Sequence, residues 1–421
     1  MLKSIYLHNF KSFAEAELPL EQLTLMIGSN ASGKSNALEA LWILSQLATG
    51  RALSVILDGE RRSDGRVRGG SAACPRVPFQ SFELGCTYQA AEYALEYRIT
   101  IRVDDGVVVE RESLKRSTED KGKMLFETEN NNTSSDYLMV WYLSDQSNDY
   151  PFRTICDRNK AVLSQIYMQI LSDNGSTSKV STDVHIFQLA LSHIFVFQPE
   201  PWRMRDYARM GDKELRFNGE NLSAVLHDLR ETKNGIEDIR KIIDDLPDNG
   251  IEKMGFILTT ARDVMLSLQE AGGVKIDARQ LSDGTLRCLA ILAAVYSEPE
   301  GSMIVVEELD NGIHPSRIAK LLHAVQQIAA ERHLLLVVTT HNPAVMDAVD
   351  PNHMDGLVLC YRSKEDGAST FARIVDLPDY LRLVAKGSTG ELAEQDAFVQ
   401  SIYHPRERGK MSYTWLKEDV L

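Results

Sequence analysis

The first third of the chain alternates between short apolar runs and polar connections. Residues 4–7 and 23–27 are apolar enough to predict strands, and residues 37–47 carry an apolar stripe at helical spacing. Three further segments alternate between apolar and polar side chains with the period of a half-buried strand; they are 81–89, 93–103 and 107–114. Residues 104–106, Asp-Asp-Gly, form a turn signal between the last two. The pattern predicts a strand–loop–helix unit followed by an antiparallel meander.

The middle of the chain is less regular. Residues 115–136 are polar, which predicts an exposed loop. Residues 194–197, Ile-Phe-Val-Phe, predict a short buried strand. Apolar positions at helical spacing predict five helices, at 160–171, 184–191, 222–229, 236–243 and 253–268.

From residue 281 onward helices and strands alternate. The predicted helices are 285–296 and 315–330, and the predicted strands are 303–306 and 334–339. These strands are continuous apolar runs, which is typical of a parallel sheet covered on both faces. We therefore predict an α/β fold with a mostly parallel sheet, an antiparallel meander and a helical insert. The expected regions are an N-terminal lobe (1–115), a variable insert (116–270) and a C-terminal lobe (271–421).

The composition favours an ordinary globular protein over a membrane-spanning or disulfide-linked one. The chain has 421 residues, of which 43% are hydrophobic and 25% are charged, as in ordinary globular proteins. Its apolar runs fall short of the ~20 residues of a membrane span, and its N-terminus lacks the features of a signal peptide. Five scattered cysteines fit a reduced cytoplasm better than a disulfide framework. The net charge of −14 disfavours non-specific attraction of nucleic acid, so such a role would require a local basic patch.

The strongest chemical signal is the segment Gly28-Ser-Asn-Ala-Ser-Gly-Lys-Ser35. It matches G-x-x-x-x-G-K-[ST] at every fixed position, and it lies between a predicted strand and a predicted helix. Glycines allow such a loop to approach phosphates closely, and its N–H groups face the anion together with the helix N-terminus. Lys34 would then neutralise the β and γ phosphates of ATP, and the Ser35 hydroxyl would bind Mg²⁺.

A pair of carboxylates follows the apolar strand 303–306. In a parallel sheet Glu307 and Glu308 would lie beside the phosphate loop, where Glu307 could hold Mg²⁺ and Glu308 could orient and deprotonate the attacking water. His341 follows the next strand and could contact the γ-phosphate. Gln198, after the strand 194–197, could contact Mg²⁺ and the water, although a surface polar residue explains it nearly as well.

A second helix start carries phosphate-binding features. Ser282 is a good N-cap residue for the helix at 285–296, and Gly284 leaves its backbone open. Taken alone, this is an ordinary capped helix. Two helix N-termini in one sheet are not expected to reach one γ-phosphate from opposite sides, so we expect a second copy of the chain to supply the Ser282 loop across an interface.

These segments together resemble the ATP-binding-cassette (ABC) ATPase superfamily, in particular its SMC/RecF-like branch, which includes the ATPase part of OLD-family nucleases. Residues 10–13, Phe-Lys-Ser-Phe, resemble that branch's N-terminal element. Residues 281–284 resemble its signature motif, 309–315 its D-loop, and Gln198 its Q-loop. Glu307 stands where many cassettes have aspartate, and Leu309-Asp310 replaces the common Pro-Glu.

The resemblance implies a function and a set of site residues. It implies an ATPase that forms a head-to-tail homodimer, with ATP and Mg²⁺ between two copies and room for a larger oligomer. Catalysis would involve Glu308, His341 and Lys34, and Mg²⁺ would contact Ser35, Glu307 and Gln198. The implied nucleotide-binding residues are Lys11, Asn30, Ala31, Ser32, Gly33, Lys34, Ser35, Asn36, Ser282 and Gly284.

The function beyond ATP stays open at this point. The chain lacks the long coiled coil of SMC proteins and a recognisable TOPRIM nuclease segment after His341, so the resemblance implies a cytoplasmic ATPase switch that controls a separate effector, as in bacterial defence or toxin–antitoxin systems. The alternatives are a DNA-maintenance ATPase that binds nucleic acid directly, a scaffold that binds ATP without hydrolysing it, and a nuclease. One basic cluster could contact nucleic acid or simply be solvated; it consists of Arg61, Arg62, Arg66 and Arg68.

Overall fold

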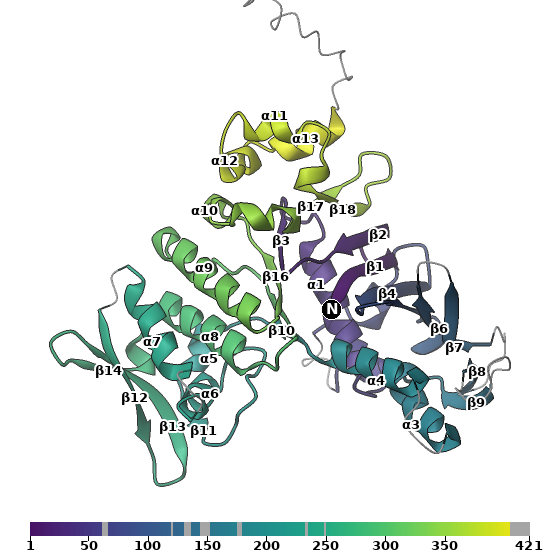
Figure 1. The fold of residues 1–421 in the computed structure, drawn as a ribbon, viewed down its shortest axis with the longest axis horizontal. Coiled ribbons are helices and arrows are strands. Elements are labelled where there is room, and N and C mark those ends of the chain that lie inside the picture. Colours follow the sequence, from purple (N-terminus) through teal and green to yellow (C-terminus); the bar gives the residue numbers. More distant parts are fainter. Residues whose placement is uncertain are drawn as a thin grey trace, which may run out of the picture.

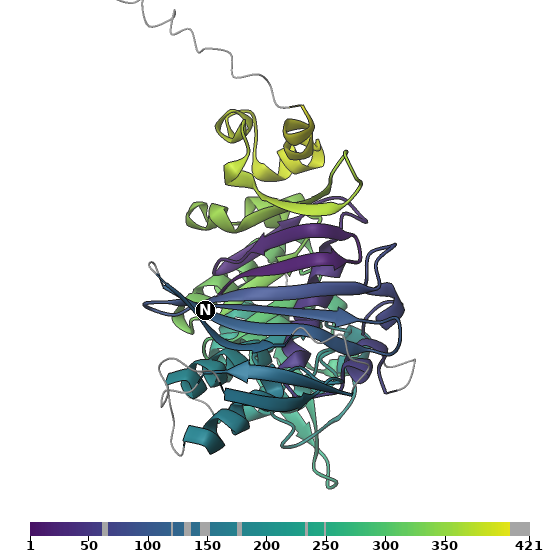
Figure 2. The same cartoon turned by 90° about the vertical axis from the view of Figure 1, so that its right-hand side faces the viewer.

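A twisted sheet runs through the centre of the molecule, and separate groups of helices cover its parts (Figures 1 and 2). The computed structural model describes residues 1–60, 66–118, 121–129, 136–143, 152–174, 179–231, 235–247 and 250–404. Within these residues the large sheet has fourteen strands in the order β10-β15-β16-β3-β17-β18-β2-β1-β4-β5-β6-β7-β8-β9. None of the described helices has the length and apolarity needed to cross a bilayer.

The parallel part of the sheet contains the strands that the apolar runs predict. It consists of β10 (Ile194–Phe197), β15 (Met303–Val306), β16 (Leu335–Thr339), β3 (Leu23–Ile27) and β17 (Leu357–Arg362). All four neighbouring pairs are parallel, so the carboxyl ends of these strands meet at one edge of the sheet. The predicted mostly parallel sheet is confirmed for this half of the molecule.

Both faces of these strands are buried, as their composition predicts. Successive residues point to opposite faces, so Val305 and Val337 join the core formed with α1 (Lys34–Leu47). Val306 and Val338 join a second core, which contains α8 (Asp283–Ser297) and α9 (Pro315–Glu331). A strand that is apolar at every position therefore serves two cores at once.

The other half of the sheet is largely antiparallel. The predicted meander is confirmed as β4 (Ser81–Gln89), β5 (Ala94–Arg102) and β6 (Val108–Ser117). The remaining strands are β1 (Leu2–Phe10), β2 (Phe13–Pro19), β18 (Ser369–Arg373), β7 (Gly122–Thr128), β8 (Tyr137–Tyr142) and β9 (Phe152–Asp157). Helices α3 (Leu163–Asn174) and α4 (Lys179–Ser192) belong to this lobe, where Phe187 contacts Tyr97 with ring centroids 5.4 Å apart.

Smaller elements complete the two ends of the molecule. A second sheet contains β11 (Ala208–Arg209), β12 (Ile251–Leu258), β13 (Asp263–Glu270) and β14 (Lys275–Asp277), beside α5 (Pro201–Met204), α6 (Leu222–Asp228) and α7 (Gly235–Asp245). Short helix α2 (Leu53–Asp58) follows α1. A C-terminal group contains α10 (Pro343–Asp347), α11 (Tyr380–Val384), α12 (Thr389–Glu394) and α13 (Ala397–Tyr403). Of these, α11, α12 and α13 lie above β17 in Figure 1.

Two predictions about the insert are wrong. The segment 253–268 is not a helix, because it contains most of the hairpin β12–β13. Its turn lacks glycine and proline; Thr259 donates its N–H to the carbonyl of Asp263 at 3.0 Å, and Arg262 takes the left-handed conformation with φ 66°. The segment 115–136 is not wholly a loop, because β7 lies within it. Residues 119–120 and 130–135 of that segment lie outside the described residues.

A buried carboxylate joins the meander to the start of α3. Glu112 on β6 accepts hydrogen bonds from the Tyr97 hydroxyl at 2.9 Å and from the N–H groups of Val162 and Leu163 at 2.6 and 2.7 Å. Burial raises the pKa of Glu112 to about 7, although the two N–H donors oppose the shift. One side chain therefore satisfies N–H groups at the beginning of α3 that no helical carbonyl can reach.

Replacing Glu112 with Gln should lower the free energy of unfolding by about 1–3 kcal/mol, because an amide cannot accept all three hydrogen bonds. Since the folded pKa of about 7 exceeds the ordinary value of 4.5, the unfolded state loses this proton first, so the contribution of Glu112 to stability falls as pH rises between these values. Urea unfolding at pH 5 and pH 8 measures both effects. Glu96→Gln, which removes an exposed ion pair with Lys115, is the control and should change little.

Candidate functional site

The segment 28–35 connects β3 to α1 and forms a loop that only glycine permits at two positions. At Gly28, φ is 145° and an added Cβ would lie 2.1 Å from the carbonyl oxygen of Cys360 on β17. At Gly33, φ is 119° and a Cβ would lie 2.6 Å from Ser369 Oγ on β18. Real Cβ atoms do not approach other atoms so closely, and L side chains avoid these φ values. The two glycines therefore let the loop pass directly beside two neighbouring strands.

Lys34 begins α1 and turns its ammonium group back onto this loop. Its Nζ donates to the carbonyl oxygens of Gly28 at 2.7 Å and Ser29 at 3.0 Å. The residue is buried, and burial lowers the pKa of Lys34, whereas the thiol of Cys360 and the carboxylates Glu308 and Glu307 act in the opposite direction. The lysine that the sequence assigns to the phosphates of ATP therefore lies at the loop between β3 and α1.

The two predicted carboxylates follow β15 at the same edge of the sheet. Glu307 Oε1 accepts a hydrogen bond from Ser35 Oγ at 2.5 Å. Glu308 has φ 50°, an unusual conformation for a residue with a side chain, and its N–H donates to Thr339 Oγ1 at 2.9 Å. The hydroxyl of a neighbouring strand therefore holds the strained backbone that directs the second carboxylate.

These groups line a cavity of about 310 Å³. His341, which follows β16, also lines the cavity. Its side chain is exposed, but partial desolvation and the nearby charge of Lys34 lower the pKa of His341. The adjacent Thr340 hydroxyl donates to Asp310 at 2.6 Å and fixes the backbone before the histidine. The lining residues are Asn30, Ala31, Ser32, Gly33, Lys34, Ser35, Asn36, Arg68, Glu307, Glu308, Thr339, His341 and Arg362.

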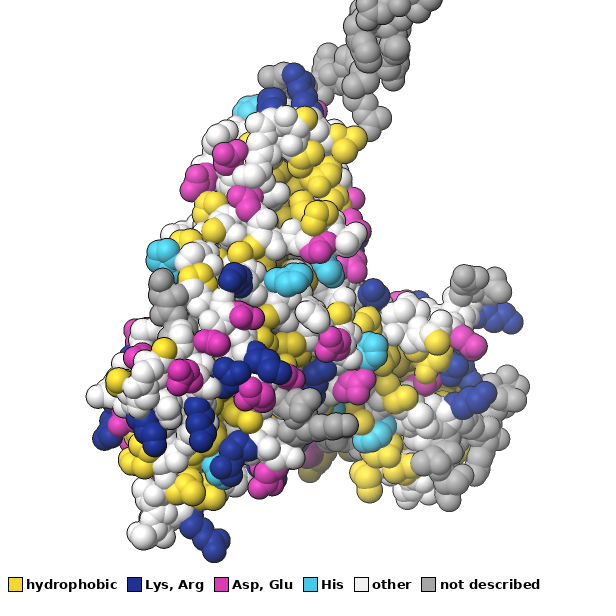
Figure 3. All heavy atoms as spheres, turned by 60° about the vertical axis from the view of Figure 1, so that its left-hand side comes forward, with side chains coloured by type: hydrophobic (Ala, Val, Ile, Leu, Met, Phe, Trp, Pro, Cys, Tyr) yellow, Lys and Arg dark blue, Asp and Glu magenta, His cyan; other side chains and the backbone are white. Residues whose placement is uncertain are grey.

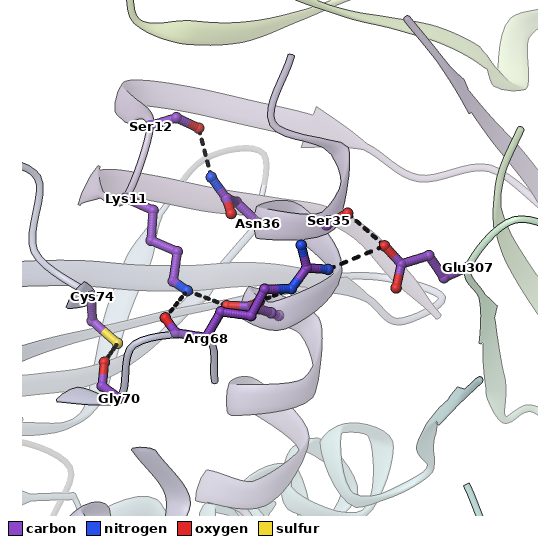
Figure 4. Close-up of polar contacts among 9 residues, drawn as sticks. Lys11, Ser12, Ser35, Asn36, Arg68, Gly70, Cys74 and Glu307 are labelled. Carbon is purple, nitrogen blue, oxygen red and sulfur yellow. Dashed lines mark hydrogen bonds and ion pairs between the residues drawn. The ribbon is translucent and has the colours of Figure 1, made fainter. Parts of the chain in front are cut away.

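A chain of ion pairs crosses one side of the cavity (Figure 4). Arg68 lies 3.4 Å from Glu307 and, through Nε, 3.2 Å from Glu39 on α1. Glu39 also pairs with Lys11, whose Nζ donates to the Arg68 carbonyl at 3.0 Å. Lys11 is thus engaged with α1 and the Arg68 segment and does not line the cavity. The neighbouring Ser12 accepts a hydrogen bond from Asn36 at 2.9 Å.

Three other predicted residues lie outside the cavity lining. Gln198 is exposed after β10, and its N–H donates to the Phe217 carbonyl at 2.7 Å. Ser282 caps α8, accepting the N–H of Thr285 at 3.1 Å. Gly284 packs against the backbone after Glu308, since an added Cβ would lie 2.6 Å from the Gly312 carbonyl oxygen. Ser282 and Gly284 therefore lie outside the cavity that contains the phosphate-type loop of the same chain.

The two described arginines of the basic cluster make internal contacts. Arg66 stacks on Phe217, with its guanidinium carbon 3.6 Å from the ring centroid, and lies 5.6 Å from the Trp42 centroid. Arg68 carries the ion pairs already described, while Arg61 and Arg62 lie outside the described residues. On the face shown in Figure 3, acidic and basic side chains are interspersed. These contacts favour the structural interpretation of Arg66 and Arg68.

Sequence reasoning missed several residues of the site. Thr339 was only the polar end of an apolar strand, and Arg362 lay in a region with no recognised motif. Arg68 was noticed as part of a basic cluster, with no link to Glu307. Each reaches the cavity through contacts that join residues far apart in the chain, 239 positions for Arg68 and Glu307 and 331 for Arg362 and Ala31.

Comparisons with known proteins place the chain in a family. Residues 23–347 match the family described as "AAA domain, putative AbiEii toxin, Type IV TA system", and the chain belongs to this family. It is also similar to the DNA replication and repair protein RecF of Gloeobacter violaceus, 37% identical over 103 residues, and of Crocosphaera subtropica, 36% identical over 93 residues. These matches span 24% and 21% of this chain and only 25% and 23% of the RecF proteins.

Among solved structures, similar chains are SMC head domains. The SMC head bound to the C-terminal winged-helix domain of ScpA is 15% identical, with a TM-score of 0.48 over 88% of this chain and 97% of that one. The SMC head domain of Thermotoga maritima is 16% identical, with a TM-score of 0.38 over 88% of this chain and 98% of that one. The family match, with the RecF relatives beside it, identifies the chain as an AAA-family ATP-binding protein related to RecF, as the sequence motifs indicated.

The effect of the Lys34 charge on the pKa of His341 should be measurable. Replacing Lys34 with Met should raise the pKa of His341, because one of the two causes of its lowering is removed while partial burial, the larger cause, remains. An NMR titration of the histidine ring, assigned by its loss in His341→Asn, measures the shift. Lys11→Met is the control, since Lys11 is not among the charges that act on His341. An unchanged His341 titration in Lys34→Met would contradict the proximity of the two groups.

Proposed function

We propose that the protein binds ATP in the 310 Å³ cavity and hydrolyses it, as a switch that alternates between a closed and an open dimer. The observation that carries this proposal is the meeting of four groups at one edge of the sheet: Lys34 and Ser35 from the loop, and Glu307 and Glu308 from the neighbouring strand. Membership in an AAA family supports a nucleotide as the ligand.

The loop provides the phosphate-binding half of the site. Backbone N–H groups at the start of α1 and the buried Lys34 charge suit the β and γ phosphates of ATP. The present bonds of Lys34 to the Gly28 and Ser29 carbonyls hold its ammonium inside the loop. Asn30, Ala31, Ser32, Gly33 and Asn36 line the same cavity and complete this surface.

The donor set beside the loop fits Mg²⁺. Ser35 Oγ and Glu307 Oε1 are hard oxygen atoms already 2.5 Å apart, and Mg²⁺ in phosphate sites is usually held by one or two protein oxygens together with phosphates and water. When bound, the ion would neutralise charge on the β and γ phosphates. Gln198, which the sequence assigned to the same ion, is outside the cavity lining, so its contribution depends on a movement of the segment after β10.

Glu308 is the proposed general base. Its position beyond β15, held by Thr339, places a carboxylate in the cavity that Lys34 also lines, where it would orient the attacking water and take its proton. His341, which lines the same cavity, would contact the γ-phosphate; its lowered pKa keeps the ring neutral at pH 7, able to donate one hydrogen bond without adding charge.

The second copy of the chain completes the site in this proposal. Ser282 and Gly284 do not line their own chain's cavity, yet they begin a fifteen-residue helix whose N-terminus suits a phosphate. A head-to-tail dimer would bring this helix start to the γ-phosphate held by the other copy. Dimerisation, and any larger assembly, would then follow the presence of ATP.

The change between the open and closed dimer is proposed to control a separate effector protein. The family description names a putative toxin of a type IV toxin–antitoxin system, which supports a role in bacterial defence or growth control. The RecF relatives support the alternative of direct action on DNA. The engagement of Arg66 and Arg68 in internal contacts weakens that alternative, and a non-hydrolysing scaffold is disfavoured by the positioned Glu308.

The dimer mechanism is tested with Glu308→Gln. This variant should bind ATP, should hydrolyse it about 100- to 10,000-fold more slowly, and should accumulate as an ATP-dependent dimer. Light scattering with ATP and Mg²⁺, beside the same variant carrying Ser282→Arg, measures the assembly. The second substitution should abolish the ATP-dependent dimer while leaving ATP binding intact. Hydrolysis at the parental rate would refute the base assignment, and an unchanged assembly state would refute the role of Ser282 in a second copy.

The role of Thr339 is tested separately. Thr339→Val removes the hydroxyl that accepts the Glu308 N–H and keeps the side-chain shape, so kcat should fall about tenfold while KM for ATP stays within about twofold. Thr24→Val is a matched control, because Thr24 is also a buried strand threonine and its hydroxyl accepts the Glu21 N–H away from the cavity. A kcat equal in the two variants would show that the Thr339 hydroxyl does not position Glu308.

A further inference from the structure

Strand β17 runs directly beside the phosphate loop because of its register with β3. The pairing Leu359↔Ile27 is the last before the loop begins, so the next residues of β17 lie beside the loop. Cys360 Sγ donates to the Ser32 carbonyl at 3.3 Å, and the Cys360 carbonyl contacts Gly28. Arg362, two residues further along, lines the 310 Å³ cavity.

The guanidinium of Arg362 holds the apex of the loop. Its Nε donates to the Ala31 carbonyl at 2.9 Å, and its Nη1 donates to the Gly367 carbonyl at 3.2 Å. Ala31 has φ 63°, a left-handed conformation that is strained for a residue with a Cβ. A fixed acceptor bond at this residue stabilises the strained apex, and it leaves the remaining N–H donors of Arg362 at the cavity.

The charge of Arg362 is uncompensated among the described residues. Arg68, the other arginine of the cavity, is neutralised by Glu39 and Glu307, whereas no described carboxylate forms an ion pair with Arg362. A guanidinium that borders a phosphate-type loop and has no anionic partner is suited to bind a phosphate oxygen through its planar fork.

The backbone of Arg362 is held by α13, the last described helix. The Tyr403 hydroxyl on α13 donates to the Arg362 carbonyl, and the Tyr403 ring meets Tyr361 edge-on, with centroids 6.3 Å apart. The ammonium group of Lys364 lies over the Tyr403 ring, 4.0 Å from its centroid. Helix α13 is thereby attached to the strand end that carries the cavity arginine.

We propose that Arg362 is a nucleotide-binding residue that contacts a phosphate group of ATP while clamping the loop at Ala31, and that Tyr403 positions it. This inference rests on the proposed function, because it names a further contact of the same cavity. It differs from the motif assignments, since nothing in the sequence around Arg362 marks a phosphate site.

The test separates the charge of Arg362 from its clamp. Arg362→Ala should weaken ATP binding, measured by calorimetry, and raise KM about tenfold with kcat within about threefold, as for a lost charged hydrogen bond. Arg362→Lys keeps the charge and should recover most of the affinity. Arg362→Gln keeps a donor for the Ala31 carbonyl without charge and should stay close to the Ala variant. Tyr403→Phe should raise KM about two- to threefold at unchanged kcat.

Controls make each outcome decisive. Arg373 is the last residue of β18; it pairs with Glu21 and does not line the cavity. Arg373→Gln should therefore bind and hydrolyse ATP like the parent. If Arg362→Gln recovers as much affinity as Arg362→Lys, the residue only clamps the loop and the phosphate contact is refuted. If all Arg362 variants bind ATP like a parent that binds and hydrolyses it, this inference fails while the proposed function stands. A parent that binds no ATP overturns both.

Discussion

The contact between the phosphate-type loop and the two strands beside it is the constraint on which the site depends. Gly28 touches the Cys360 carbonyl of β17, and Gly33 touches Ser369 of β18, at distances that exclude any side chain. Because β17 and β18 come from the C-terminal part of the chain, the loop acquires its shape only when both ends of the sequence have joined one sheet. Loop geometry is therefore a tertiary property, although the loop sequence itself is local.

Two residues with strained backbones lie at the same edge of the sheet. Ala31 and Glu308 both have positive φ without being glycine, and each is held by a bond from a neighbouring element: Arg362 for the first and Thr339 for the second. Such conformations persist only where surrounding structure over-determines them. The parallel core supplies that rigidity, because its strands are buried on both faces and their ends cannot shift independently.

The sequence predicted those parts of the fold whose cause is local or strongly repeated. Continuous apolar runs identified β15 and β16, and alternation identified the meander, because burial on two faces or one leaves a direct mark on composition. The hairpin β12–β13 was mistaken for a helix because its turn at 259–263 carries no glycine or proline. For the candidate site, the sequence pointed to the residues of the motifs, but it did not point to the residues that hold them in place. Thr339 and Arg362 are defined by which strand lies next to which, and a single sequence does not state this.

The division of the site between two parts of the chain has a physical consequence. Gly284, at the start of α8, is in backbone contact with Gly312, which lies four residues after Glu308. Arg287 on α8 is half-buried near Asp283, Glu308 and Asp310, and burial lowers its pKa while these three carboxylates oppose the shift. In the proposed dimer, the helix start that meets one nucleotide would thus be packed against the segment that carries the base for the other. Because close-packed backbones move together, displacement of α8 by a phosphate would also shift the segment that carries Glu308. The two nucleotide sites of the proposed dimer would then not act independently.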